Sequence, residues 1–137
     1  MSVNFKSSQA PEPVGDYPHA KQVGGFLFLS GVGPRKRGSK KIPGVKLSEN
    51  GKVLSSDIKK QCVSVFENVR LILEESGSSW DNIVDVTVFL TNMNRDFKEY
   101  NKLYAEYFSG PLPTRTTVEV GCLPTPIAIE LKVIATI

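Results

Sequence analysis

The sequence predicts a single α/β domain, residues 1–137, in which a sheet of five or six short strands is accompanied by two helices. Two segments, 56–76 and 96–108, repeat apolar residues every three or four positions, as amphipathic helices do. Short runs rich in β-branched and apolar residues surround them, and no internal repeat or linker divides the chain. Because two helices cover only one face of such a sheet, we expect a homo-oligomer to bury the other face.

The composition excludes several classes of protein. With 40% apolar and 23% charged residues, the chain is neither disordered nor collagenous, and a net charge of +3 is too mild to indicate a nucleic-acid binder. Cys62 and Cys122 form no CxxC motif, and His19 has no partner at metal-ligand spacing, so we expect no disulfide framework and no metal site. No segment approaches the roughly 18 apolar residues of a membrane span, and the first residues do not resemble a signal peptide, so we expect a cytoplasmic protein.

The first third of the chain predicts a hairpin followed by a loop. Residues 19–30 favour two short strands around Gly24-Gly25, a pair that can take the positive φ angles of a hairpin turn. Residues 31–53 are rich in glycine, proline and basic side chains, which is typical of a long mobile loop. Long loops often carry function.

The segment 56–76 is the clearest helix. Its apolar face comprises Ile58, Cys62, Val65, Val69 and Ile72. Ser55, Ser56 or Asp57 can cap its first turn, and Gly77 suits a left-handed end.

The rest of the chain predicts a strand, a helix and two further strands. The run 83–91 is apolar on both faces, which favours a buried position within the sheet. The helix 96–108 is expected to turn aromatic side chains toward the core, namely Phe97, Tyr100, Tyr104 and either Tyr107 or Phe108. Strands are expected at 114–120 and 127–136.

Two charged residues in these last strands are candidates for chemistry. Arg115 follows Pro111 and Pro113 near the start of a strand, where its guanidinium could bind a carboxylate bidentately or could be a solvated edge charge. Glu130 lies on the strand face opposite Ile129 and Leu131. It is either a solvent-facing charge or, if that face is a subunit interface, a carboxylate in a partly dry cleft that could position a water.

The remaining candidates are individually commonplace. Tyr17, Ser30, Thr117 and Asn94 could supply hydrogen bonds, and the basic segment from Arg35 to Lys41, which includes Arg37, could be a solvated loop or could close over an anion. Cys122 has no nearby histidine to activate it as a nucleophile. There is no P-loop, no GxGxxG motif and no nucleophile elbow.

The C-terminal run PTRTTVEVGCLPTPIAIELKVIAT strongly resembles the signature of the reactive intermediate deaminase family, also called Rid or YjgF. The segments GDYPHA, FLFLSG, DVTVFLTNMNRDF and EYNKLYAEYF fit the same family in order, so the likeness spans nearly the whole chain. The resemblance implies a chorismate-mutase-like mixed sheet with two helices on one face, assembled as a homotrimer with active sites between subunits. It further implies that Arg115 grips the substrate carboxylate, that Glu130 holds the attacking water, and that neither cofactor nor metal takes part.

One departure bears on the substrate implied by this resemblance. Typical imine deaminases of the family have cysteine two residues after the arginine, where this chain has Thr117. The whole pattern looks most like 2-aminomuconate deaminases, whose dicarboxylate enamine substrate would give Arg35 or Arg37 a second carboxylate to bind. Tyr17, Ser30, Asn94 and Thr117 would complete the pocket. The alternatives are a deaminase of 2-iminopropanoate or 2-iminobutanoate, a non-enzymatic module that binds small acids, and an RNA-related activity.

Overall fold

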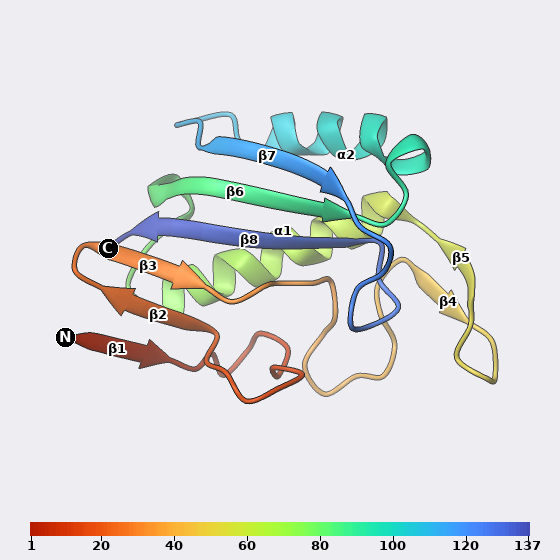
Figure 1. Ribbon diagram of the computed structural model, residues 1–137, viewed down its shortest axis with the longest axis horizontal. Helices are drawn as coiled ribbons and strands as arrows, with labels where there is room; N and C mark the ends of the chain where they lie inside the picture. The colour runs from red at the N-terminus through yellow and green to blue at the C-terminus, as the bar shows by residue number, and fades with distance from the viewer.

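Six strands form one twisted sheet in the computed structural model, which describes residues 1–137 (Figure 1). The strand order is β1-β2-β3-β8-β6-β7, and every neighbouring pair is antiparallel except β6 and β7, which are parallel. The strands are β1 (Ser2–Phe5), β2 (Ala20–Val23), β3 (Phe26–Leu29), β6 (Ile83–Leu90), β7 (Thr114–Glu119) and β8 (Ile129–Thr136). The sheet is therefore mixed, as the resemblance implied.

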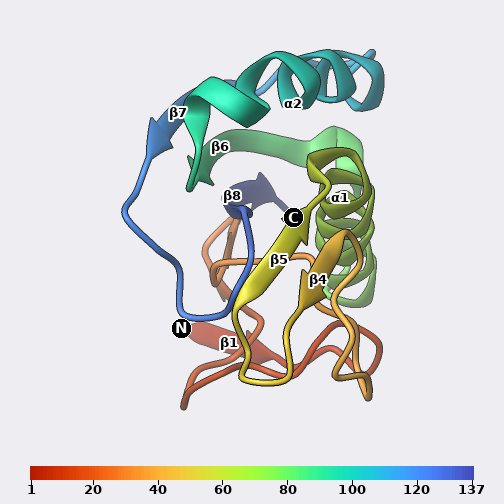
Figure 2. The same ribbon diagram turned by 90° about the vertical axis from the view of Figure 1, so that its right-hand side faces the viewer.

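Both helices pack on the same face of this sheet (Figure 2). They are α1 (Ile58–Glu75) and α2 (Met93–Tyr107), and a single 3-10 turn, η1 (Trp80–Asn82), precedes β6. Neither helix combines the length and apolar character that crossing a bilayer requires. The expected fold class, two helices on one face of a mixed sheet, is confirmed.

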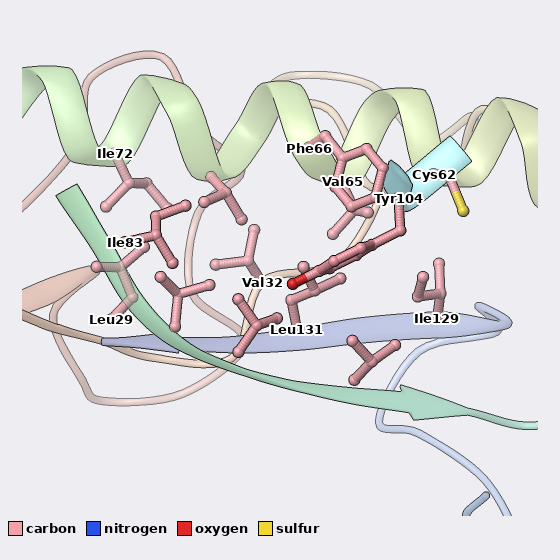
Figure 3. Packing of buried hydrophobic residues seen from close by; sticks show 14 of the residues in the cluster. Leu29, Val32, Cys62, Val65, Phe66, Ile72, Ile83, Tyr104, Ile129 and Leu131 are labelled. Atoms are coloured by element: carbon pink, nitrogen blue, oxygen red, sulfur yellow. The ribbon is translucent and has the colours of Figure 1, made fainter. Parts of the chain in front are cut away.

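The hydrophobic core fills the layer between the helices and the sheet (Figure 3). The apolar stripe predicted for α1 is buried in full, and Val65 and Ile72 point toward β6 and β8. From the sheet, Ile129 and Leu131 of β8 are completely buried. Burial of each such side chain contributes about 1.5–3 kcal/mol, so this layer supplies most of the favourable free energy of folding.

The ends of α1 follow the predicted signals. Asp57 is the N-cap, and its carboxylate accepts a hydrogen bond from the Lys60 amide at 3.2 Å. At the other end, Gly77 takes a φ of +85°, which an L side chain rarely adopts.

Three strands lie where the sequence predicts none. The predicted loop 31–53 contains β4 (Val45–Leu47), which pairs with β5 (Val53–Ser56) as a separate hairpin. β1 (Ser2–Phe5) pairs only with β2, at the edge of the main sheet. All three segments are short and mostly exposed, so they lack the apolar alternation by which strands are recognised.

The second helix also departs from its prediction in two respects. It begins at Met93 because the Asn92 side chain caps it, accepting a hydrogen bond from the Arg95 amide at 3.0 Å. Phe97, expected in the core, is 36% exposed, whereas Tyr100, Tyr104 and Phe108 are buried.

The sheet face opposite the helices is uncovered. Its exposed apolar side chains include Val23, Phe26, Phe28 and Val118, at 37 to 47% exposure. Lys132 of β8 lies on this face, and its ammonium donates to the Leu29 carbonyl. Several exposed apolar side chains on one sheet face are typical of surfaces that contact another molecule.

One buried polar residue of α1 connects the helix to two other segments. Gln61 is fully buried; its amide oxygen accepts from the Ala128 amide at 2.8 Å, and its Nε2 donates to Ser56 Oγ at 2.9 Å and to the Gly44 carbonyl at 3.3 Å. It thus joins α1 to the start of β8 and to the β4–β5 hairpin.

Replacement Gln61→Leu is expected to lower the free energy of unfolding by about 1–3 kcal/mol, because a buried amide is left without an acceptor. Urea unfolding at a fixed protein concentration measures this loss. The exposed neighbour serves as control, since Lys59→Gln should change stability by no more than about 0.5 kcal/mol. Equal stability of Gln61→Leu and the wild type would contradict the assignment.

Candidate functional site

The alternation of β8 places a carboxylate on the uncovered face of the sheet. Ile129 and Leu131 point into the core with no exposed surface, so Glu130 between them points the other way. Its side chain is only half-buried there, against the segment that follows β3.

Glu130 lines a small cavity of about 140 Å³, which we call the Glu130 cavity. Segments far apart in the sequence build it: Tyr17 comes before β2, Gly31 follows β3, Arg35 comes from the basic segment and Thr125 from the turn before β8. Three of the residues named from the sequence, Tyr17, Arg35 and Glu130, therefore meet in one place.

Gly31 fixes how closely the main chain approaches the carboxylate. A Cβ atom at this position would lie 2.9 Å from Glu130 Oε2 and 3.0 Å from its carboxyl carbon. Any larger residue would push the Glu130 side chain away. It is the missing Cβ atom at Gly31, and not a special backbone angle, that lets Glu130 lie so close to the main chain.

Burial raises the pKa of Glu130 above its ordinary value, and the positive charge of Arg35 acts in the opposite direction. A carboxylate with a raised pKa is a better base than an exposed one, because it holds a proton more firmly. The cavity therefore contains a group suited to accept a proton from water.

The segment that carries Arg35 is held from behind by two buried side chains of α1. Ser64 Oγ donates to the Pro34 carbonyl at 2.7 Å, and Asn68 Nδ2 donates to the carbonyls of Gly33 and Arg35 at 2.9 and 2.7 Å. We call Ser64 and Asn68 the carbonyl clamp. Three consecutive carbonyls are fixed in this way, and the Arg35 guanidinium itself donates to the Glu12 carbonyl at 2.9 Å.

The other groups near the cavity are also anchored. Tyr17 Oη accepts from the Val14 amide at 3.2 Å. Ser30 Oγ donates to the Pro18 carbonyl at 2.7 Å and lines an adjoining smaller cavity, which shares Tyr17, Gly31 and Arg35 with the first.

Arg115 lies elsewhere, on the helix side of the edge strand β7. Its guanidinium donates to Asn101 Oδ1 at 2.9 Å and sits 4.7 Å from the ring centre of Tyr104 and 5.5 Å from that of Tyr100. Thr117 Oγ1 is 3.5 Å from the Tyr100 hydroxyl. Stacking on aromatic rings holds the guanidinium while leaving it exposed at the edge of the sheet.

A single chain does not bring Arg115 and Glu130 together. Arg115 is the β-sheet neighbour of Val86, which is buried beneath the helices, whereas Glu130 is the neighbour of Phe89 on the uncovered face. Across the sheet, Glu130 is level with Phe89 of β6 and with Val118 of β7. The Cα atoms of Glu130 and Arg115 are therefore separated by two strand spacings across the sheet and by three residues along β7. That is roughly 10 Å across and 10 Å along the sheet, with the side chains on opposite faces.

Two more residues named from the sequence lie outside the cavity. Arg37 donates to the carbonyls of Ala10 and Ser7 at 2.8 Å each and pairs with Glu12 at 3.0 Å, so it fastens the N-terminal segment. Asn94 is exposed on the first turn of α2, seven residues before Asn101 and hence about 10 Å along the helix from it.

Sequence reasoning missed Gly31, the carbonyl clamp and the residues beneath Arg115. A signal for the clamp was present, because Gln61, Ser64 and Asn68 interrupt a buried helix face with polar side chains at helical spacing. No local pattern in the sequence predicts a role for Asn101, since its contact with Arg115 depends on how α2 packs beside β7.

The surroundings of the histidine and of the buried cysteine give both side chains a structural role. His19 is buried; its Nδ1 accepts from the Ser7 amide at 2.9 Å and its Nε2 donates to the Pro11 carbonyl at 2.7 Å. Burial raises the pKa of Cys62 to about 12, which leaves its thiol unreactive. No three side chains of the His, Cys, Asp and Glu types gather where they could hold a metal ion.

Comparison with known proteins gives consistent matches over the whole chain. The family described as Endoribonuclease L-PSP matches residues 7–137. A RutC family protein of Pyrococcus abyssi is 40% identical over 129 residues, which cover 94% of this chain and 92% of that protein. Reactive Intermediate Deaminase A, chloroplastic, of Arabidopsis thaliana is 35% identical over 131 residues, covering 96% of this chain and 64% of that protein.

Solved structures show the same fold. The crystal structure of E. coli TdcF with bound serine matches with a TM-score of 0.84 at 29% identity and covers 98% of both chains. A Rid protein from Yersinia pestis matches with a TM-score of 0.83 at 33% identity and covers 100% of both chains.

Replacement Arg35→Met is expected to raise the pKa of Glu130 further, because it removes the charge that favours the ionised carboxylate. A pH titration of the Glu130 side-chain carbon by NMR measures the change. Lys36→Met makes the same change in net charge one residue away, outside the cavity, and should have a smaller effect. An unchanged or lowered pKa in Arg35→Met would show that the two groups do not interact.

Proposed function

The chain belongs to the Rid/YjgF family, whose members are also named RutC and endoribonuclease L-PSP proteins, and we propose on this basis that it is a hydrolytic deaminase of enamine or imine acids. The family includes reactive intermediate deaminases. The observation that carries the proposal is the half-buried Glu130, held against Gly31 in a cavity that also contains Tyr17 and Arg35.

The proposed reaction uses few groups. An enamine acid first tautomerises to its imine. Once the imine nitrogen is protonated, the imine carbon beside the carboxylate is strongly electrophilic. Glu130 accepts a proton from a water as its oxygen forms a bond to that carbon, giving a carbinolamine. The same carboxyl group then returns the proton to the nitrogen. The C–N bond breaks as the hydroxyl gives its proton to the carboxylate, which passes it to solvent, and becomes the carbonyl, so that ammonia and a 2-oxo acid leave. Arg115 holds the substrate carboxylate, so the main contribution of the protein is orientation.

The positions of Arg115 and Glu130 support a site shared between chains. They face opposite sides of the sheet, so one small substrate cannot reach both within a single chain. Arg115 lies on the edge strand β7, where a neighbouring copy can approach with its own Glu130 cavity. We therefore propose a homotrimer in which each site takes Arg115 from one subunit and Glu130 from the next. The same assembly would cover the exposed apolar face of the sheet.

The favoured substrate is 2-aminomuconate. Arg35 lines the Glu130 cavity, so a dicarboxylate would meet one arginine from each of the two chains. Thr117, beside the Arg115 guanidinium, stands where other imine deaminases have cysteine. Short acids such as 2-iminobutanoate are the alternative, since a cavity of about 140 Å³ accommodates them and they need no second arginine.

RNA cleavage, which the name of the family describes, is less well supported by this chain. The one histidine, His19, is buried and uses both ring nitrogens to hold the N-terminal segment. The ionisable side chains that line the Glu130 cavity are those of Tyr17, Arg35 and Glu130, and none of them is a histidine.

Purified protein is expected to release ammonia from freshly generated 2-aminomuconate well above the spontaneous rate. Glu130→Gln should lower kcat by about 10²- to 10⁴-fold, because it removes the base. Arg115→Ala should lower kcat/KM by about 10- to 100-fold, because it removes a charged hydrogen bond to the carboxylate.

The matched controls for these variants are Glu106→Gln, at an exposed helix position, and Arg70→Ala, at a half-buried one; both lie outside the site and should keep full activity. Binding of the substrate carboxylate without turnover would identify a small-acid-binding module instead. Full activity in Glu130→Gln would refute the proposed role of this residue.

Arg35→Ala is expected to raise KM for 2-aminomuconate by about tenfold or more while changing KM for 2-iminobutanoate little, because only the first substrate has a second carboxylate. Steady-state ammonia release with both substrates gives the comparison, and Lys36→Ala serves as the control for charge. Equal losses for the two substrates would count against a second carboxylate site at Arg35.

A further inference from the structure

A second and larger cavity lies on the outer side of α1, between this helix and the segment 36–43. It has a volume of about 770 Å³ and shares no lining residue with the Glu130 cavity. Pockets for small organic ligands occupy about 300–1,000 Å³, so this one is of suitable size. We call it the α1 groove.

The floor of the α1 groove is apolar although it faces solvent. Val63 of α1 is 43% exposed, Leu71 two turns further along is half-buried, and Pro43 faces them from the loop. An ordinary solvated helix face would carry polar residues at these positions. An apolar floor of this kind favours contact with the body of an organic molecule.

Basic side chains surround this floor and are free to bind. Lys36, Lys59 and Lys60 line the groove, and none of the four ion pairs of the chain involves a lysine. The two acidic residues of the groove are already engaged, because Asp57 caps α1 and Glu67 pairs with Arg70. Asp57 keeps its negative charge while it caps the helix, so three lysines against one unpaired carboxylate leave a net positive charge in the groove.

We propose that the α1 groove is a second binding site, for a small organic polyanion such as a nucleoside diphosphate. Its phosphate or carboxylate groups contact Lys36, Lys59 and Lys60, and its apolar or heterocyclic body rests on Val63 and Leu71. The charges give attraction at a distance, and the floor adds contact area that a simple inorganic anion cannot use.

The groove adjoins the part of the molecule that positions Arg35. Ser64 and Asn68, the carbonyl clamp, line the groove and hold the carbonyls of residues 33–35. A ligand in the groove therefore lies on one side of the clamp while the Glu130 cavity lies on the other. The proposed binding site does not depend on the deaminase activity. The link between the groove and Arg35 through the carbonyl clamp, in contrast, rests on the proposed function.

The test uses adenosine 5′-diphosphate as the probe and the full-length protein. In a ¹⁵N NMR titration we expect shifts of the Lys60 and Val63 amides and of the Asn68 side-chain amide, with affinity that falls as salt is raised. Adenosine and inorganic pyrophosphate, titrated separately, should each bind at least about tenfold more weakly than the diphosphate. Calorimetry gives the affinities.

Variants distinguish this site from general attraction to a basic protein. Lys59→Gln with Lys60→Gln should weaken binding at least about tenfold, while Lys98→Gln with Lys102→Gln on α2 removes the same charge and should leave it unchanged. Val63→Glu, at an exposed position, should abolish binding without loss of the folded spectrum.

Three results would overturn the proposal. They are no binding at millimolar probe, shifts confined to residues of the Glu130 cavity, and equal weakening in the two lysine pairs. Equal affinity for pyrophosphate and adenosine 5′-diphosphate would overturn the claim that the apolar floor contributes to binding. None of these outcomes depends on whether the protein is a deaminase, because all are measured by binding.

Discussion

The two-residue alternation of β8 is the constraint on which the site depends. Ile129, Leu131 and Val133 fill the core beneath α1, and their burial fixes the register of the strand. A slip by one residue would turn these side chains out and force the Glu130 carboxylate into an apolar layer, at a cost of several kcal/mol. The packing of the core thus decides that Glu130 emerges on the uncovered face, where Gly31 leaves just enough room for it.

The helix behind the sheet has a second role besides filling the core. Its polar residues Gln61, Ser64 and Asn68 are buried, and each makes at least one hydrogen bond to a main-chain group of another segment. Gln61 holds the start of β8 just before Glu130, while the other two hold the segment that carries Arg35. Because both segments are hydrogen-bonded to one rigid helix, α1 fixes the main chain on either side of the cavity, while the Glu12 carbonyl holds the Arg35 guanidinium itself.

Local patterns in the sequence predicted the elements that bury apolar side chains, and non-local pairing explains what they missed. The helix 58–75 and the strands β6 and β8 were recognisable because periodicity and burial agree there. β1 and the β4–β5 hairpin are short and exposed, so no periodicity identifies them. Glu130 and Arg115 were candidates from their places in the last two strands, and a family resemblance implied their roles. That they face opposite sides of the sheet follows from the register of β6 with β7 and β8, which no local pattern specifies. The same holds for Arg35 and Arg37: only the folded chain shows that both bind the N-terminal segment and that Arg35 alone lines the cavity.

The central claim is that each site is completed by two chains, and mixing two inactive variants tests it most directly. Arg115→Ala and Glu130→Gln are unfolded together, refolded as a mixture and assayed for ammonia release from 2-aminomuconate. If subunits associate at random in a ring, roughly one quarter of the sites will combine an intact Arg115 with an intact Glu130 from the neighbouring chain. The account predicts recovery of about a quarter of the wild-type activity. A mixture no more active than the two variants kept apart would contradict it.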